Sequence, residues 1–292
     1  LKGLKGNKFE GGQRVPFFVV WGDRFKRDQR FTGLTSSLDI FATVVDALDI
    51  PEEGLHKPIA GVSLLPYLSG EKSGNPHEAL FWRKMDTRAI RSGSYKLIIT
   101  RGVDSVLYNM DQDVEEMHDL LSSEPEKARE LMEQLSEWEQ ACCKDPLWIE
   151  EGWAEEVNGN KKRYKMKIDR LFVVSLGAIT GLASCSSGQE EEAQRPNILI
   201  LLADDAGYAD FGFMGATDIQ TPNIDRLAAE GCIFTDAHVA ATVSSPSRSM
   251  MLTGRYGQRY GYECNLDKPG DGLPDDEELL PALLKRYDYR TG

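Results

Sequence analysis

The sequence predicts an α/β fold in which a mixed or parallel sheet is flanked by helices, accompanied by a small antiparallel sheet and one long helix. Three observations lead to this class. An uninterrupted apolar run at residues 197–203 is typical of a buried parallel strand. The apolar residues at 39–48 recur with helical spacing. Short strand-like runs between residues 80 and 108 are separated by turns, and an amphipathic helix at 125–142 follows them.

The composition indicates a globular protein with an acidic surface. Its 292 residues are 41% hydrophobic, which suffices for one large domain or two ordinary ones. Lys and Arg number 34 against 47 Asp and Glu, and the net charge of -13 argues against nucleic acid as a partner. The five cysteines include no Cys-x-x-Cys pair, so neither a disulfide framework nor a zinc site is predicted.

The first two parts of the chain carry different patterns. Residues 1–78 contain a glycine-rich segment, a core strand at 17–20 and the helix at 39–48. Residues 79–157 carry the short strands, and we expect the helix at 125–142 to turn its apolar side chains inward onto them. These inward residues are Leu131, Leu135 and Trp138.

Residues 196–292 alternate strand and helix patterns, as expected of an α/β unit. After the strand at 197–203, a helix begins with Pro222 in its first position, where the missing N–H costs nothing, and ends at Gly231. A strand at 232–237 follows, and residues 247–252 have the pattern of an opening helix.

Residues 158–195 form a linker with the features of an export signal. A short basic start at Met166 leads into the apolar run 171–183, which is too short to span a membrane as a helix. Leu-Ala-Ser-Cys, ending at Cys185, resembles a bacterial lipobox, and an acidic tether follows it. The alternative interpretation of the apolar run 171–183 is a buried helix of a globular domain. Because export signals act at an N-terminus, we expect two joined reading frames, or else a rearranged gene with an inactive signal.

Two acidic residues follow the predicted strand at 197–203. Ligands of open α/β sheets bind at the carboxyl ends of the strands, which is where Asp204 and Asp205 would lie. Carboxylate oxygens suit calcium or magnesium. The alternative is a solvated acidic turn. The pair is therefore a candidate metal site.

The most specific motif lies at residues 244–255. It reads Ser-Ser-Pro-Ser-Arg from Ser244 to Arg248, and Thr-Gly-Arg follows at residues 253–255. A nucleophile at the start of a helix meets oriented N–H groups and the positive end of the helix dipole, and both favour an anionic group. The alternative is a loop that happens to be rich in serine.

This order of motifs resembles the sulfatase family of the alkaline-phosphatase-like superfamily. The resemblance implies that Ser244 becomes formylglycine through the serine-type maturation route, and that Arg248 stabilises its charge. It also implies that Asp204 and Asp205 bind Ca²⁺. The segment Lys-Gly-Asn-Lys-Phe-Glu-Gly-Gly-Gln-Arg-Val-Pro, which starts at Lys5, resembles the family segment whose lysine binds the sulfate group.

The same resemblance implies the remaining functional expectations. Residues 1–78 and 196–292 are similar to the end and the start of a sulfatase catalytic domain, and residues 79–157 to the family's C-terminal subdomain. The substrate would be a sulfated glycan or an aryl sulfate, and a maturase would be a partner. A lipid anchor at Cys185 would place the protein in the periplasm or at the cell surface, if translation begins at Met166.

Two further functions compete with the sulfatase interpretation. The first is a phosphate or phosphonate ester hydrolase that uses unmodified Ser244. The second is a lipid-anchored remnant that binds glycans without catalysis. Because the family's general acid and half of its calcium ligands have no counterpart in this sequence, we expect the 292-residue chain to be inactive or nearly so.

Overall fold

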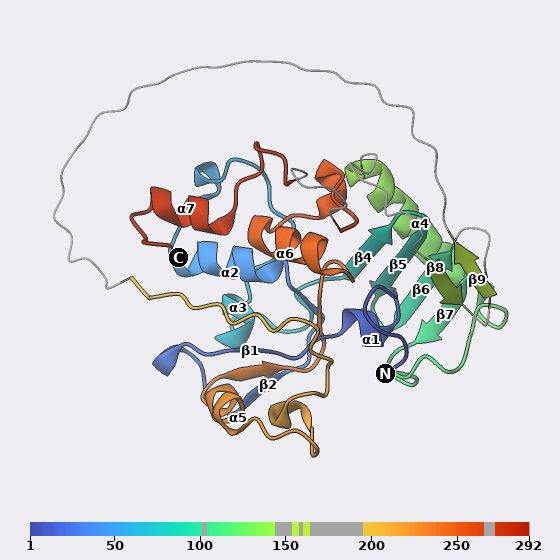
Figure 1. Ribbon diagram of the computed structural model, residues 1–292, viewed down its shortest axis with the longest axis horizontal. Coiled ribbons are helices and arrows are strands. Elements are labelled where there is room, and N and C mark those ends of the chain that lie inside the picture. The colour runs from blue at the N-terminus through green and yellow to red at the C-terminus, as the bar shows by residue number, and fades with distance from the viewer. Residues whose placement is uncertain (101–103, 144–153, 158–159, 164–194, 266–271, 292) are drawn as a thin grey trace.

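The computed structural model describes residues 1–100, 104–143, 154–157, 160–163, 195–265 and 272–291 (Figure 1). The helices are α1 (Glu10–Gln13), α2 (Asp39–Ala47), α3 (Leu65–Leu68), α4 (Pro125–Cys142), α5 (Pro222–Ala229), α6 (Ser244–Thr253) and α7 (Leu280–Arg286). The strands are β1 (Phe17–Val19), β2 (Gln29–Phe31), β3 (Thr35–Ser36), β4 (Ala79–Lys84), β5 (Thr87–Ser92), β6 (Tyr95–Thr100), β7 (Val106–Asn109), β8 (Ala154–Val157), β9 (Asn160–Arg163), β10 (Cys232–Phe234) and β11 (Ala237–His238). Short 3₁₀ helices occupy Gly22–Arg24, Glu52–Gly54, Gly212–Met214 and Gly257–Tyr260. These elements confirm the predicted α/β class.

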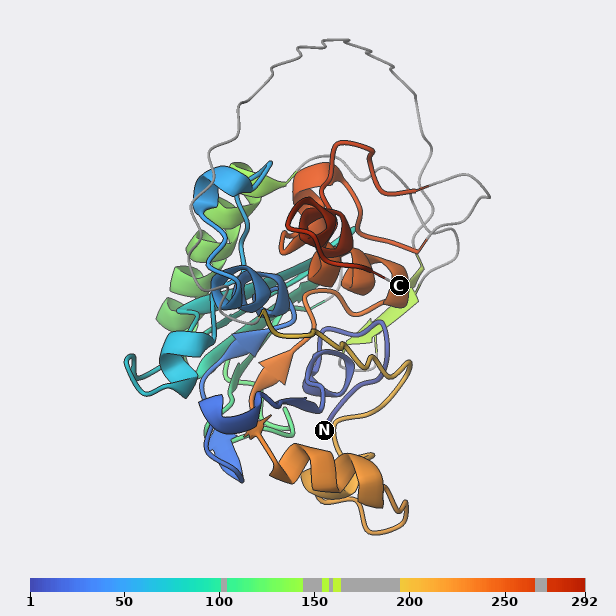
Figure 2. The same cartoon turned by 90° about the vertical axis from the view of Figure 1, so that its left-hand side faces the viewer.

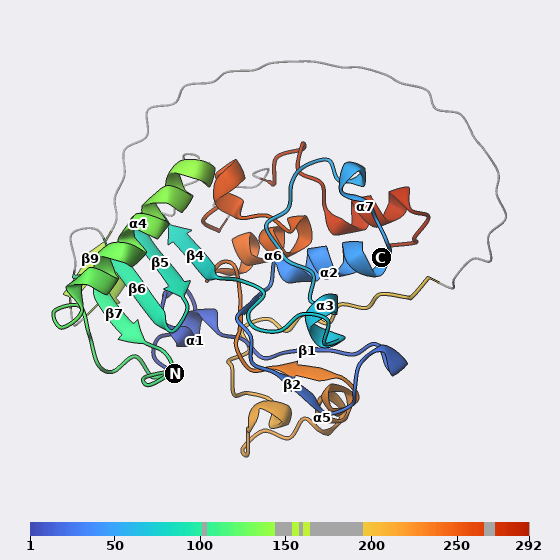
Figure 3. The same ribbon diagram turned by 180° about the vertical axis from the view of Figure 1, so that it is seen from behind.

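The predicted antiparallel sheet and its helix form one layered unit. Strands β4, β5, β6 and β7 pair in sequence order, and α4 lies across one face of them (Figure 3). That face is closed by Leu131 and Leu135 of α4 against Ile90 and Leu97 of the sheet. The amphipathic spacing therefore predicted both the bounds and the buried side of α4. Trp138 is half-buried and stacks on Phe81 with ring centroids 5.0 Å apart.

A second sheet joins the two ends of the chain. Strand β10 lies between β1 and β2, antiparallel to β1 and parallel to β2. Ile233 pairs with Phe18 on one side and with Arg30 on the other. The sheet is therefore mixed, and its central strand comes from a different part of the sequence than its neighbours. Helix α5 precedes β10 directly and packs beside it (Figure 2).

The helices above this sheet also combine both ends of the chain. Phe41 and Val45 of α2 pack with Leu283 and Leu284 of α7 in one buried cluster. Strands β3 and β11, which also come from the two ends of the chain, form a short parallel pair. Burial of shared apolar surface is the main favourable term in folding. Residues 1–68 and 195–291 therefore stabilise each other as parts of one core.

One prediction is wrong. Residues 197–203 form no strand, and the side chains of Leu199 and Leu201 are 82% and 68% exposed. A buried parallel strand needs a hydrogen-bonding neighbour. Within the described ranges, β10 pairs with β1 on one side and β2 on the other, and no strand pairs with this segment. The apolar run therefore crosses the surface as an irregular segment that ends at the acidic pair.

The predicted linker lies mostly outside the described residues, including the whole signal-like segment 166–185. Strands β8 and β9 form an antiparallel hairpin across the expected boundary at residues 157 and 158. Among the residues that are described, no helix is both long and apolar enough to cross a membrane.

Candidate functional site

Helix α6 brings the predicted nucleophile and its arginine together. Ser244 is the first residue of the helix, and Arg248 lies one turn later on the same side. Asp204 contacts both of them: Ser244 Oγ donates to Asp204 Oδ1 at 3.5 Å, and Arg248 Nη2 lies 3.4 Å from Asp204 Oδ2. The serine, the arginine and one of the predicted metal ligands thus form a single group at the start of α6.

Lys5 joins this group from the other end of the sequence. Its ammonium group donates to the carboxylate of Asp205, the neighbour of Asp204. Asp205 has a φ of 59°, a left-handed conformation that is uncommon outside glycine and turns the chain sharply at the acidic pair. All five predicted site residues therefore meet at one place, although Lys5 and Asp205 are 200 positions apart.

The site is open to solvent. The exposed fraction of the side chain is 45% for Lys5, 49% for Arg248 and 64% for Asp204. Ion pairs that are this exposed contribute roughly 0–1 kcal/mol to stability. These charged side chains are therefore placed to bind a ligand rather than to stabilise the fold. The two carboxylates can bind a metal ion, and the two cations beside the Ser244 hydroxyl can bind an anion.

The start of α6 supplies backbone N–H groups and the positive end of a helix dipole, and both attract anions. The helix has ten residues, and the positive end of its dipole coincides with Ser244. The N–H of Ser245 points to Asn265 Oδ1 at 3.4 Å, a long hydrogen bond that a better acceptor could replace. Together with Lys5 and Arg248, this end of the helix suits a tetrahedral oxyanion.

The acidic pair offers the type of ligand that a hard cation prefers. Asp204 and Asp205 provide exposed carboxylate oxygens beside Ser244. Calcium takes six to eight oxygen ligands, so the pair fits part of such a shell and water or other groups would complete it. In the described structure, Lys5 and Arg248 balance the two negative charges.

The tyrosines that follow the motif serve packing. Tyr256 and Tyr260 are buried, and Tyr256 Oη accepts a hydrogen bond from the N–H of Phe81 at 3.4 Å. Burial raises the pKa of Tyr256 above its ordinary value. Tyr262 is also buried, and its hydroxyl contacts the Ser245 hydroxyl behind the site. The Tyr260 hydroxyl contacts Ser249 and Thr253 of α6, and Tyr256 packs with Met250 of the same helix, so these rings belong to the core around α6.

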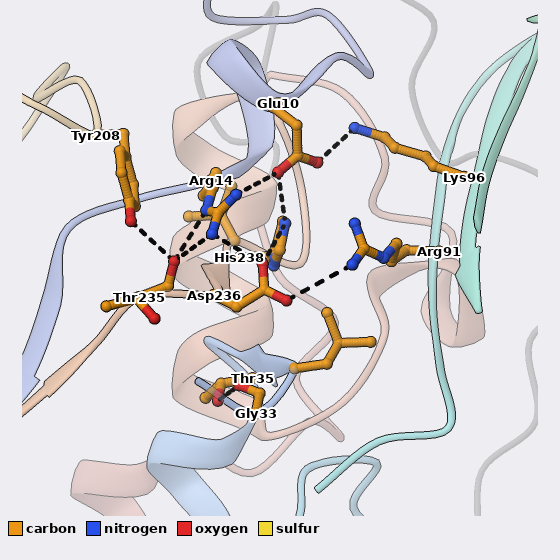
Figure 4. A network of polar contacts seen from close by, with 12 residues as sticks. Glu10, Arg14, Gly33, Thr35, Arg91, Lys96, Tyr208, Thr235, Asp236 and His238 are labelled. Carbon is orange, nitrogen blue, oxygen red and sulfur yellow. Dashed lines mark hydrogen bonds and ion pairs between the residues drawn. The ribbon is translucent and has the colours of Figure 1, made fainter. Parts of the chain in front are cut away.

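A buried charge network joins α1 to β6 and β11, and no motif in the sequence predicts it (Figure 4). Lys96 Nζ lies 2.8 Å from Glu10 Oε1 and 2.9 Å from Glu116 Oε1, and all three side chains are fully buried. Glu10 Oε2 also contacts His238 Nε2 at 3.2 Å. Burial raises the pKa of Glu10, but the charges of Lys96 and His238 outweigh this effect and hold it well below its ordinary value.

Part of this network has the composition of a metal site. Single ligand atoms of Glu10, Asp236 and His238 lie within 4.8 Å of one another. Arg14, however, lies 3.5 Å from Glu10 and 3.4 Å from Asp236, and Arg91 lies 3.8 Å from Asp236. A divalent cation would be repelled by these guanidinium groups. The cluster is therefore an ion-pair network that joins α1 to β11.

The four histidines of the chain all have partners away from Ser244. The pairs are His56 with Glu278, His77 with Asp39, His118 with Asp113, and His238 with Glu10. No histidine is therefore in place to protonate a leaving group at Ser244.

Comparisons with known proteins agree with the motif. Residues 196–292 match the sequence model of the sulfatase family. Arylsulfatase G of Canis lupus familiaris is 43% identical over 129 residues, which are 44% of this chain and 24% of that protein. N-acetylgalactosamine-6-sulfatase of Homo sapiens is 43% identical over 111 residues, which are 35% of this chain and 21% of that protein. A solved phosphonate monoester hydrolase of Agrobacterium radiobacter is 19% identical with a TM-score of 0.31, and the match covers 45% of this chain and 29% of that one. The chain thus spans about a quarter of the length of these curated relatives.

Proposed function

We propose that this chain, whose residues 196–292 match the sulfatase family, carries the anion-binding and nucleophile-bearing part of a sulfuric ester hydrolase. The observation that carries the proposal is the convergence of Lys5, Arg248 and the acidic pair on Ser244. A sulfate ester presents a tetrahedral anionic group, and two cations at the start of a helix complement such a group. Removal of one hydrogen-bond donor that stabilises such a developing negative charge costs on the order of 10²–10³ in turnover in other enzymes.

The nucleophile in this proposal is residue 244 after conversion of its side chain to formylglycine. One hydroxyl of the hydrated aldehyde would attack sulfur and displace the alcohol of the ester, which takes up a proton from solvent. The second hydroxyl would then lose its proton and reform the aldehyde as the C–O bond to sulfate breaks, a release step that serine lacks. Arg248 and Lys5 hold the negative charge that builds on the sulfuryl oxygens. Asp204 lies within 3.5 Å of the oxygen at position 244 and orients it.

Calcium is the metal that we propose for this site. Asp204 and Asp205 would hold it through carboxylate oxygens, and its charge would stabilise the sulfuryl group beside residue 244. A bound Ca²⁺ would compensate the two carboxylates in place of Lys5 and Arg248, and both cations would then be able to contact the substrate.

The proposed substrate is a sulfated sugar or an aryl sulfate. One relative is named N-acetylgalactosamine-6-sulfatase and the other arylsulfatase G, and these names support that class. We also propose a serine-type maturase as a partner, and a lipid anchor at Cys185 for a product translated from Met166, with a periplasmic or cell-surface location. Since no histidine contacts Ser244, the 292-residue chain by itself should turn over sulfate esters orders of magnitude more slowly than a complete enzyme.

Mass spectrometry of residue 244 tests the proposal. The chain is coexpressed with a serine-type maturase and digested with trypsin, and the peptide 227–248 is examined. We expect a mass lower by two hydrogens and reaction of the peptide with a hydrazide probe. A peptide from Ser244→Ala is the control and should show neither. An unmodified serine under these conditions would contradict the formylglycine mechanism, and phosphate-ester turnover by the same preparation would favour the hydrolase that uses unmodified Ser244.

A further inference from the structure

The loop that carries Lys5 is attached to the segment that leads into Ser244. The N–H of Gly6 donates to the carbonyl of Thr242 at 2.8 Å. The hydroxyl of Thr242 donates to the carbonyl of Gly6 at 3.2 Å and accepts from Lys8 Nζ at 3.1 Å. Gly6 directly follows Lys5, and Thr242 lies two residues before Ser244. These bonds therefore link the backbone next to Lys5 with the backbone next to Ser244.

The attachment is buried, in contrast to the site that it supports. Thr242 is 5% exposed and Lys8 is 1% exposed. Gly6 has a φ of 96°, a conformation that side chains other than glycine rarely adopt, so the loop is shaped to turn at this point. Hydrogen bonds that are shielded from water hold their geometry more firmly than exposed ones, because their loss leaves polar groups unpaired.

Only a hydroxyl can make both side-chain bonds at once. A threonine hydroxyl has one donor and two acceptor positions, and here the donor faces Gly6 while an acceptor faces Lys8. Valine has nearly the same shape and can make neither bond. A change from threonine to valine therefore removes both side-chain bonds with little change in side-chain shape, and it leaves the backbone bond from the Gly6 N–H to the Thr242 carbonyl in place.

We propose that Thr242, together with Lys8, is a positioning residue that sets the distance between the Lys5 ammonium group and residue 244. The inference rests on the proposed function, because it assigns the attachment to binding of the sulfuryl group. The tip of the long Lys5 side chain is held by an exposed ion pair with Asp205, and a pair this exposed contributes only roughly 0–1 kcal/mol. Its location is set by the backbone at Gly6, and the backbone at Gly6 is held by Thr242.

Binding of inorganic sulfate to the 292-residue chain, measured by isothermal titration calorimetry in the presence of Ca²⁺, tests this role. We expect Thr242→Val to weaken sulfate binding about tenfold, the size of one lost hydrogen bond to a charged group. Thr242→Ser keeps the hydroxyl and should bind within about twofold of the unchanged chain. The matched control is Thr35→Val, because Thr35 is buried and donates to the carbonyl of Gly33 at 2.9 Å without contact to the Lys5 loop.

A second variant separates positioning from a general loss of structure. In a Lys5→Ala background the ammonium group is absent, so Thr242→Val should then have no further effect on sulfate affinity. An equal loss in both backgrounds, or a loss no larger than that of Thr35→Val, would overturn the inference.

Failure of the proposed function gives a different pattern. If Lys5→Ala itself leaves sulfate affinity unchanged, or if the unchanged chain binds no sulfate, the site is not a sulfuryl site and the inference falls with it. If Lys5→Ala weakens binding and Thr242→Val does not, the proposed function stands and the positioning role alone is refuted.

Discussion

Replacement of Lys96 by methionine should destabilise the protein strongly. Lys96 is fully buried in β6 and lies between the carboxylates of Glu10 and Glu116. Methionine keeps the length of the side chain but removes its charge. The substitution therefore leaves two buried carboxylates without the cation that they share.

The expected magnitude follows from the contacts that remain. Removal of one partner from a buried ion pair costs about 3–5 kcal/mol. Glu10 would keep His238 at 3.2 Å and Arg14 at 3.5 Å, so its carboxylate stays compensated. Glu116 would keep the N–H of Glu10 at 2.7 Å, and burial already raises its pKa, which lowers the cost of protonating it. We therefore expect a loss near the lower limit, about 3 kcal/mol.

Urea unfolding followed by tryptophan fluorescence measures this loss. A decrease of about 3 kcal/mol should lower the midpoint by about 1 M or more. Lys127→Met is the control, because Lys127 pairs with Glu130 on the surface of α4 and should cost less than about 0.5 kcal/mol. Adding Glu116→Gln to Lys96→Met should recover part of the loss. A cost for Lys96→Met that matches the control would refute the assignment of a buried, charge-compensated network.

Three further outcomes are expected. The pKa of Glu10 is lowered in the folded state, so its ionised form stabilises the protein above its ordinary pKa of 4.5, and this stability is lost as the pH falls toward the folded pKa. Glu10→Gln should therefore make the free energy of unfolding depend less on pH in acid, and an unchanged dependence would contradict this. Leu131→Ala should lower the free energy of unfolding in urea by about 2–5 kcal/mol, because Leu131 is buried. Met132 is 42% exposed, so Met132→Ala should lower it by less than about 0.5 kcal/mol, and equal effects would contradict the packing of α4. Ca²⁺ should raise the thermal midpoint of the unchanged chain but not that of Asp205→Asn, and equal shifts would place the ion elsewhere.

The elements that the sequence predicts well are those whose pattern is local. Helix α4 has the predicted bounds because its apolar residues repeat with the helical period and Pro125 marks its start. Strands β4 to β7 follow because short turns join consecutive strands, which then pair with their neighbours in sequence. In these cases the neighbours in space are also the neighbours along the chain.

The predictions that fail or are missing depend on distant partners. The apolar run at 197–203 indicates a preference for burial, but no pattern says whether a pairing strand is available, and none is found in the described ranges. The network of Lys96, Glu10 and Glu116 gave no sequence signal, because a charged residue in a strand normally faces solvent. That Lys5 and Asp205 belong to one site is implied only by the resemblance to a family, and their direct contact was not predicted.

The measurement that tests the central claim most directly is sulfate affinity at the site built from both ends of the chain. Isothermal titration with inorganic sulfate and Ca²⁺ would compare the unchanged chain with Lys5→Ala and Arg248→Ala. Lys57→Ala is the matched control, because Lys57 pairs with Asp276 and Glu277 away from Ser244. We expect each of the first two variants to bind sulfate about tenfold or more weakly, and the control to bind it as the unchanged chain does. Equal affinity in all four proteins would contradict a sulfuryl site formed by Lys5, Arg248 and Ser244.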